Sequence, residues 1–169
     1  MQSFDEMVLH FLKDMYYAER SILKALPDLS AAAQNDGLKE ALRHHTDETK
    51  TQVQRLEQVF AGLGHAPEGV TCEALVGLMQ ETDDVLKECR ASGPVRDAAL
   101  LACAQAVEHY EIARYGALAE WLNDRGRRDL ASLLERSLEE EKRADAKLND
   151  LAKREINKAA AAEVAKPIS

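Results

Sequence analysis

Apolar side chains recur every three or four residues through four long segments of the chain. The segments are residues 4–33, 37–62, 95–124 and 127–156. In the first of them, Val8, Leu12 and Met15 follow one another at this spacing. A period of three to four residues is typical of a helix that buries one stripe of its surface. A shorter segment, residues 73–90, repeats the pattern. The sequence therefore predicts an all-α protein.

The ends of these segments carry recognisable helix signals. Ser3 is a predicted N-cap, with Glu6 three residues later as its capping-box partner. Asn35–Gly37 reads as a turn between the first two helices. Pro27 is expected to bend the first helix or to end it early, because proline removes one backbone hydrogen bond. The alanines after Pro27 indicate that the helix resumes.

The order of the helices predicts a particular bundle. Short turns join the long helices into two antiparallel hairpins, and residues 63–94 connect one hairpin to the other. A connection that carries its own helix lets the second hairpin start at the opposite end of the bundle, as in the ferritin-like variant of the four-helix bundle. We therefore predict one ferritin-like domain over residues 1–158 and a frayed, alanine-rich tail over residues 159–169.

Composition narrows the classes of function. Aromatic residues make up 5% of the chain, with 8 glycines and 4 prolines, which argues against a sandwich or barrel. A formal charge of -8 argues against a nucleic-acid partner. No apolar run is long enough for a membrane span, and Asp5 and Glu6 do not fit a signal peptide. Three widely spaced cysteines fit a reducing compartment. We expect a cytoplasmic protein.

Acidic residues fall on the apolar stripes, where they are not expected. Glu19 lies between Met15 and Ile22 on the stripe of the first helix. The polar residues on the stripes or at their edges are Glu19, His45, Glu48, Gln52, Glu108, Glu111, Glu141 and Asp145. Burying an isolated carboxylate is very costly, so four helices that each bury one need a compensating cation.

The two hairpins also match each other in spacing. Glu48 follows Glu19 by 29 residues, and Glu141 follows Glu111 by 30. Packed about a pseudo-twofold axis, the hairpins would bring four carboxylates together. Oxygen donors with one imidazole suit iron(II) or manganese(II), and bridging carboxylates suit a two-metal site. Two divalent ions would move the formal charge from -8 to -4. The opposing interpretation is that a chain with 30 acids places some on a stripe by chance.

Several stretches resemble the YciE/YciF family of small bacterial ferritin-like proteins associated with stress responses. These stretches are Leu12–Glu19, Gln54–Phe60, Cys72–Ala74, Val107–Glu111 and Glu140–Lys142. The resemblance implies a ferritin-like bundle, a dinuclear metal centre, a homodimer and no settled biochemical activity. By position in these motifs, the implied ligands are Glu19, Glu48, Glu111 and Glu141, followed by Glu108, Gln52, Asp145 and His45. Thr51 and Ala144 stand where the Glu-x-x-His pattern of ferritins and rubrerythrins would place histidines.

Three functional hypotheses follow. The first is a redox-active di-iron or di-manganese protein that reduces dioxygen or peroxide. The second is a non-catalytic stress protein that acts through protein–protein interaction, with a structural metal or none. The third is iron storage in a cage, for which the sequence offers no assembly helix. Tyr16, Tyr110 and Tyr115 lie near the predicted ligands and are expected to be core residues whose hydroxyl groups are hydrogen-bonded.

Overall fold

The structure, a computed structural model, describes residues 1–89 and 93–163 of the chain. These residues form helices and no strand. The helices are α1 (Phe4–Ala32), α2 (Asp36–Gly62), α3 (Glu73–Glu88), α4 (Pro94–Asp124) and α5 (Arg128–Leu151), followed by a π-helical turn (Ala152–Ile156) and α6 (Asn157–Ala162). The prediction of an all-α chain is confirmed.

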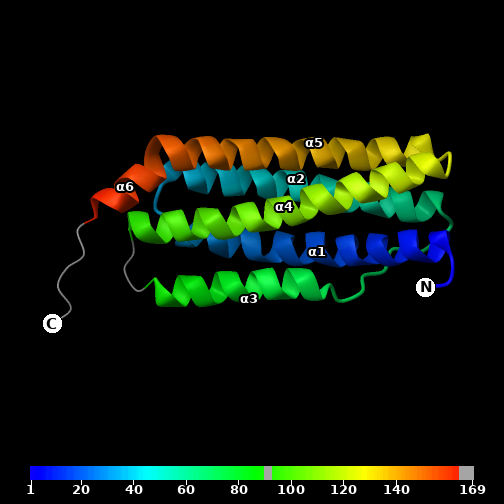
Figure 1. Cartoon of the computed structure of the whole chain (residues 1–169), viewed down its shortest axis with the longest axis horizontal. Coiled ribbons are helices and arrows are strands. Elements are labelled where there is room, and N and C mark those ends of the chain that lie inside the picture. The colour runs from blue at the N-terminus through cyan, green and yellow to red at the C-terminus, as the bar shows by residue number, and fades with distance from the viewer. Residues whose placement is uncertain (90–92, 164–169) are drawn as a thin grey trace.

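Four long helices lie side by side along the long axis of the molecule, and α3 lies against their outer side (Figure 1). The α1–α2 pair and the α4–α5 pair are antiparallel hairpins, and the hairpins meet where α2 packs on α5 and α1 packs on α4. After α2 the chain runs back along the bundle through α3, so α4 begins at the end where α2 began (Figure 1). This is the predicted ferritin-like arrangement with its helical crossover.

The helix boundaries agree with most of the sequence signals. The Ser3 hydroxyl oxygen accepts a hydrogen bond from the Glu6 backbone N–H at 3.1 Å, as the capping signal predicts. Pro27 lies inside α1, and the helix continues to Ala32 rather than ending early. The fourth long helix also continues further than predicted, because residues 159–162 of the expected tail belong to α6. Residues 164–169 of that tail lie outside the described part of the chain.

The apolar core is divided into two clusters along the bundle. One cluster gathers residues from the end of the bundle that contains the start of α1, including Leu12, Leu56, Leu118 and Leu134. The other lies toward the opposite end and includes Ile22, Leu42, Leu100 and Leu148. Each of the four long helices has buried polar residues near the boundary of the two clusters. The fold therefore positions a polar layer in the middle of an apolar bundle.

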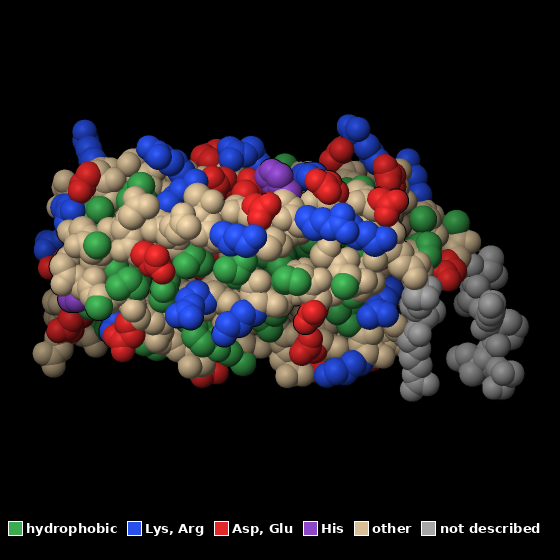
Figure 2. All heavy atoms as spheres, turned by 180° about the vertical axis from the view of Figure 1, so that it is seen from behind, with side chains coloured by type: hydrophobic (Ala, Val, Ile, Leu, Met, Phe, Trp, Pro, Cys, Tyr) green, Lys and Arg blue, Asp and Glu red, His purple; other side chains and the backbone are tan. Residues whose placement is uncertain are grey.

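The outer surface is mixed in charge. Figure 2 shows basic and acidic side chains interspersed over the back of the molecule, with small apolar areas between them. In the described part of the chain, none of the helices has the combination of length and apolar character that a bilayer crossing requires.

Candidate metal centre

Each long helix of the bundle contributes a buried acid or a histidine to the polar layer. The relative exposure of these side chains is at most 5%. They are Glu19 on α1, His45 on α2, Glu108 and Glu111 on α4, and Glu141 on α5. Each lies on the inward stripe of its helix, which is why the apolar period of the sequence identified them.

Three of these acids converge around the imidazole of His45. His45 Nε2 lies 3.6 Å from Glu108 Oε1 and 3.9 Å from Glu111 Oε2. On the other side of the ring, His45 Nδ1 lies 3.9 Å from Glu141 Oε2. One possible ligand atom from each of the four residues lies within 4.8 Å of all the others. The arrangement has the composition and compactness of a metal site.

Glu19 lies next to this cluster, and a tyrosine orients it. The Tyr115 hydroxyl donates a hydrogen bond to Glu19 Oε1, and both side chains are fully buried. The second oxygen, Glu19 Oε2, has no partner among the described residues. Tyr115 is thus a core residue with a hydrogen-bonded hydroxyl, as expected, and its partner is a predicted ligand.

Many buried polar atoms of the layer lack a hydrogen-bond partner within the described part of the chain. These atoms are Glu19 Oε2, His45 Nδ1, Gln52 Oε1, Glu108 Oε2, both carboxylate oxygens of Glu111, and Glu141 Oε2. Buried polar groups in folded proteins are nearly always satisfied, and each exception requires an explanation. A cation held between these atoms would satisfy several of them at once. The residues present therefore fit a metal.

The pKa values of the cluster also indicate that these buried groups lack a compensating charge. Burial raises the pKa of Glu108 to about 8. Burial and the nearby carboxylate of Glu141 raise the pKa of Glu19 and of Glu111 well above the ordinary range. For Glu141, burial and the neighbouring Glu108 have the same effect on its pKa. Burial lowers the pKa of His45 to about 4. Without a cation, the surroundings therefore favour the neutral forms of these acids and of the imidazole.

Three other predicted site residues, Gln52, Glu48 and Asp145, lie outside the group of four converging residues. Gln52 is fully buried, and its amide nitrogen donates to Glu141 and, at 3.1 Å, to Glu140 Oε2. Glu48 lies at the edge, where its Oε2 is 3.1 Å from His44 Nδ1 and 4.0 Å from His45 Nδ1.

Asp145 is engaged away from the cluster. Its Oδ1 accepts a hydrogen bond from the Gln105 amide at 3.1 Å and lies 3.4 Å from His109 Nε2. The described geometry thus leaves Asp145 outside the group of converging side chains.

Sequence reasoning missed the pair formed by Arg55 and Glu140. The guanidinium of Arg55 donates to both oxygens of Glu140, at 2.5 and 2.7 Å, and to the Ser137 hydroxyl at 3.2 Å. Because Gln52 bridges Glu140 and Glu141, this pair supports the position of Glu141. The spacing of Arg55, three residues after Gln52 on the same helix face, was the available signal.

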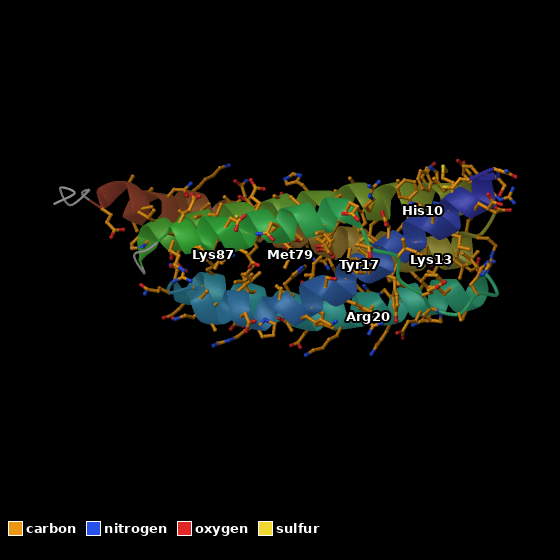
Figure 3. The ribbon with its side chains drawn as sticks, turned by 90° about the horizontal axis from the view of Figure 1, so that it is seen from below. His10, Lys13, Tyr17, Arg20, Met79 and Lys87 are labelled. Carbon is orange, nitrogen blue, oxygen red and sulfur yellow. The ribbon has the colours of Figure 1, made fainter. Side chains whose placement is uncertain are left out.

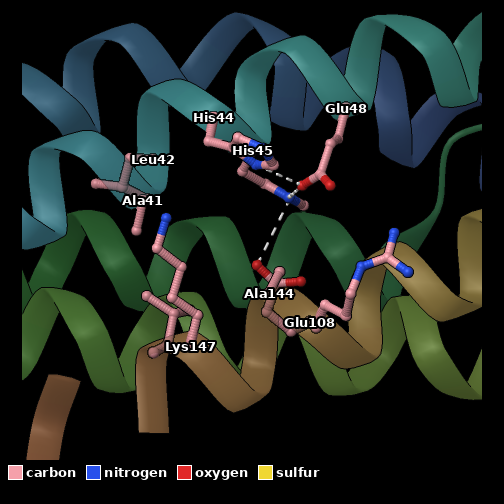
Figure 4. A pocket seen from close by; sticks show the side chains of 10 residues that line it. Ala41, Leu42, His44, His45, Glu48, Glu108, Ala144 and Lys147 are labelled. Carbon is pink, nitrogen blue, oxygen red and sulfur yellow. Dashed lines mark ion pairs between the residues drawn. The ribbon is translucent and has the colours of Figure 1, made fainter. Parts of the chain in front are cut away.

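A cavity of about 150 Å³ adjoins the cluster from the side of α2 and α5. His45 and Glu108 lie at its inner wall, and Glu48 and His44 are close by, as Figure 4 shows. The exposed side chains of Arg143 and Lys147 complete its lining. Ala41, Leu42, Ala144 and Leu148 add an apolar part to its wall. The cluster is therefore buried but borders this cavity, which we call the polar cavity for the charged side chains in its lining.

Fold and site together define a ferritin-like helical bundle whose central layer could hold a metal ion. Residues 3–161 match the family described as a domain of unknown function, DUF892, and the chain belongs to this family. The chain is 42% identical to the protein YciF of Escherichia coli K12 over 161 aligned residues. The aligned region is 95% of this chain and 96% of that protein. The resemblance to the YciE/YciF family is confirmed.

Solved structures support the same fold. The crystal structure of the E. coli stress protein YciF matches with a TM-score of 0.88 and 41% identity, over 94% of this chain and 99% of that one. The protein YcfI from Rhodopseudomonas palustris matches with a TM-score of 0.85 and 47% identity, over 88% of this chain and 94% of that one. A protein from Xanthomonas campestris at 19% identity and a TM-score of 0.72 shares the fold.

Proposed function

We propose that this chain is a stress-associated protein that binds two divalent metal ions, iron or manganese, in its central layer and reduces dioxygen or peroxide there. The observation that carries the proposal is the convergence of three buried carboxylates and one imidazole with unpartnered atoms, beside the buried carboxylate of Glu19. The similarity to the E. coli stress protein YciF supports the association with stress.

The donor set indicates the class of metal. Carboxylate oxygens with one imidazole nitrogen suit hard and borderline divalent ions better than soft ones. The charge of the cluster indicates the number of ions. Four ionised glutamates, Glu19, Glu108, Glu111 and Glu141, carry four negative charges, which two divalent ions would balance. A single ion would leave two buried carboxylates uncompensated or protonated.

The residues divide into holding and positioning roles. His45, Glu108, Glu111 and Glu141 would hold one ion, because their ligand atoms lie within 4.8 Å of one another. Glu19 would hold the second ion together with the acids that the two sites share. A bound redox metal supplies the electrons that reduce an oxidant.

The remaining contacts prepare the protein for this role. Tyr115 fixes Glu19, and Gln52, held at Glu140, fixes Glu141. Such contacts to ligands set their orientation and basicity. The apolar clusters enclose the layer on both sides along the bundle axis.

Metal analysis of paired glutamine variants tests the proposal. The protein is produced with added iron or manganese, purified without chelator and analysed for metals by mass spectrometry. We expect close to two ions per chain, and less than half of that in Glu141→Gln. Glu139→Gln is the matched control, because Glu139 is an exposed neighbour on α5 that pairs with Lys142. Fewer than one ion per chain in the unaltered protein, or equal loss in both variants, would overturn the proposal.

The proposal extends to compartment and assembly. We propose that the protein works in the cytoplasm, on the basis of its three free cysteines, which suit a reducing compartment. We also propose a homodimer, which the family resemblance suggests. Sedimentation velocity of the purified protein tests the assembly, and a monomer-sized or cage-sized species would contradict it.

A further inference from the structure

Two pockets meet at the same pair of side chains, and only one of them also has lysine and arginine side chains in its lining. The polar cavity described above reaches His45 and Glu108 from the side of α2 and α5. A second pocket reaches the same two residues from the side of α1, α3 and α4. His45 Nε2 and Glu108 Oε1 lie 3.6 Å apart, so this pair forms a common inner wall. The metal centre is thus bordered by two distinct spaces.

The second pocket is small and apolar. Its volume is about 30 Å³, and its walls include Ile22, Met79, Ala104 and Val107. The Thr82 hydroxyl in its lining donates to the Leu78 carbonyl oxygen at 2.8 Å and is therefore not free to bind a ligand. Met79 and Ala104 are half-buried, which places the rim of the pocket near the surface. Met79 belongs to α3, which Figure 3 shows on the same face of the molecule as α1.

The polar cavity differs in both size and charge. It is about five times larger by volume, at about 150 Å³ against about 30 Å³. Arg143 and Lys147 line it, and neither forms an ion pair among the described residues. Glu48 adds a carboxylate at the edge of the centre. Ions and water would find polar partners along this side.

We propose that the two pockets are separate access routes to the centre, and that the apolar pocket admits a small uncharged molecule of the size of dioxygen. This inference rests on the proposed function, since it names the class of molecule that reaches that same site. Hydrated ions are excluded from the apolar pocket because its walls would not replace their water. A peptide or lipid segment is excluded by the volume, which is comparable to that of one water molecule in the liquid.

Xenon is a direct probe of the apolar pocket, because it occupies dry apolar cavities and needs no metal. Crystals of the unaltered protein are pressurised with xenon, and its binding is also followed in solution by xenon NMR. We expect a xenon atom between α1, α3 and α4. The Ala104→Leu variant fills the pocket and is expected to lose this site. Ala106→Leu, an exposed position on the same helix, is expected to keep it. Because xenon is larger than dioxygen, crystals of the metal-free protein are also pressurised with dioxygen. Absence of both gases from this pocket would overturn the proposal.

Two alanines, one in each pocket, separate the routes kinetically. Ala104 lines the apolar pocket and Ala144 lines the polar cavity. We expect Ala104→Leu to slow the oxidation of bound iron(II) by dissolved dioxygen at least about tenfold while iron(II) uptake changes less than about twofold. Ala144→Leu is expected to show the reverse.

The controls distinguish a failure of the proposed access routes from a failure of the proposed function. If Ala104→Leu does not fold by circular dichroism, Ala104→Val replaces it. Equal slowing of both processes by both variants would overturn the separation of the routes. If the protein binds no iron at all, the proposed function fails, and the xenon experiment still decides whether the apolar pocket is accessible.

Discussion

Tyr115 is the residue whose removal tests the polar layer most directly. Its hydroxyl donates to Glu19 inside the bundle. We expect Tyr115→Phe to leave both oxygens of Glu19 unpartnered and to lower the free energy of unfolding of the metal-free protein by about 1–3 kcal/mol. Urea denaturation measures the change. Tyr17→Phe is the control, because Tyr17 is half-buried and its hydroxyl has no hydrogen bond among the described residues. An equal effect of both variants would contradict the prediction.

The raised pKa values of the buried acids predict an unusual pH dependence. Glu108 titrates at about 8 in the folded metal-free protein, and at about 4.3 when unfolded. Between these values the folded state keeps a proton that the unfolded state has lost, so the free energy of unfolding falls as pH rises. His45 has the opposite effect, but below its unfolded pKa of about 6.5.

Denaturation of the metal-free protein at pH 6.5 and 8 therefore isolates the acids. Each acid that stays protonated contributes a loss of up to about 2 kcal/mol over this interval. Glu108→Gln is expected to reduce the slope, because its amide does not titrate. A free energy of unfolding that is constant or rises over this interval would contradict the raised pKa values.

The buried acids could be predicted from the sequence because a helix has a fixed period. Glu19, Glu111 and Glu141 share the phase of the leucines around them, and phase decides which side of a helix is buried. Asp145 has a similar phase, yet Gln105 and His109 engage it on the neighbouring helix. Side-chain partners across helices depend on packing, and the spacing within one helix does not contain that information.

At the scale of helices, Asp97 connects α4 to the turn between α1 and α2, which lies more than 60 residues earlier in the chain. It lies buried in the first turn of α4 and accepts hydrogen bonds from the backbone N–H groups of Gln34 and Asn35, at 2.8 and 2.7 Å. These groups belong to the turn between α1 and α2. Asp97 therefore fastens the start of the second hairpin to the turn of the first.

Removing this carboxylate should destabilise the bundle. We expect Asp97→Ala to cost about 2–3 kcal/mol of unfolding free energy, because two buried N–H groups lose a charged acceptor. Asp97→Asn keeps one acceptor oxygen, so its free energy of unfolding should lie between those of the unaltered protein and Asp97→Ala. Asp124→Ala, an exposed position at the end of the same helix, should change stability by less than about 0.5 kcal/mol. Guanidinium denaturation compares the variants, and a neutral Asp97→Ala would refute the role.

Helix types and lengths were predictable where local chemistry determines them. The Ser3 cap and the turn at Asn35 act within a few residues of themselves. The effect of Pro27 was less predictable, since packing along α1 keeps the helix continuous around it. The π-helical turn at Ala152–Ile156 also depends on packing, because Ala152 and Ile156 are buried in the second apolar cluster. A local sequence signal does not report such tertiary contacts.

At the scale of the molecule, the length of the connection between the two hairpins made the topology predictable. Two hairpins of similar length can be joined in several ways, and only a connection long enough to run back along the bundle permits the ferritin-like order. Residues 63–94 meet that requirement, and α3 runs along the bundle as expected (Figure 1). The position of α3 against α1 and α4 depends on its own apolar face, and with it the apolar pocket arises. That pocket could not be seen in the sequence.

The charge of the whole molecule gives the last prediction. A formal charge of -8 counts every acid as ionised. The raised pKa values of Glu19, Glu108, Glu111 and Glu141 mean that the metal-free protein holds protons on this cluster to higher pH than exposed acids do. Two divalent ions would then displace these protons, since metal ligands bind deprotonated. Each displaced proton would offset one of the four arriving charges, so the net charge would change by less than the difference between -8 and -4.

Calorimetric titration with manganese(II) at pH 6.5, in buffers of different ionisation enthalpy, measures this exchange. We expect release of up to about four protons for two bound ions, and fewer in Glu141→Gln. Native electrophoretic mobility should change little on loading. Exposed acids such as Glu139 are already ionised at this pH, so binding at the surface would release no protons and would shift the mobility. That second outcome would place the ions outside the central layer, because only its buried carboxylates hold protons for a metal to displace.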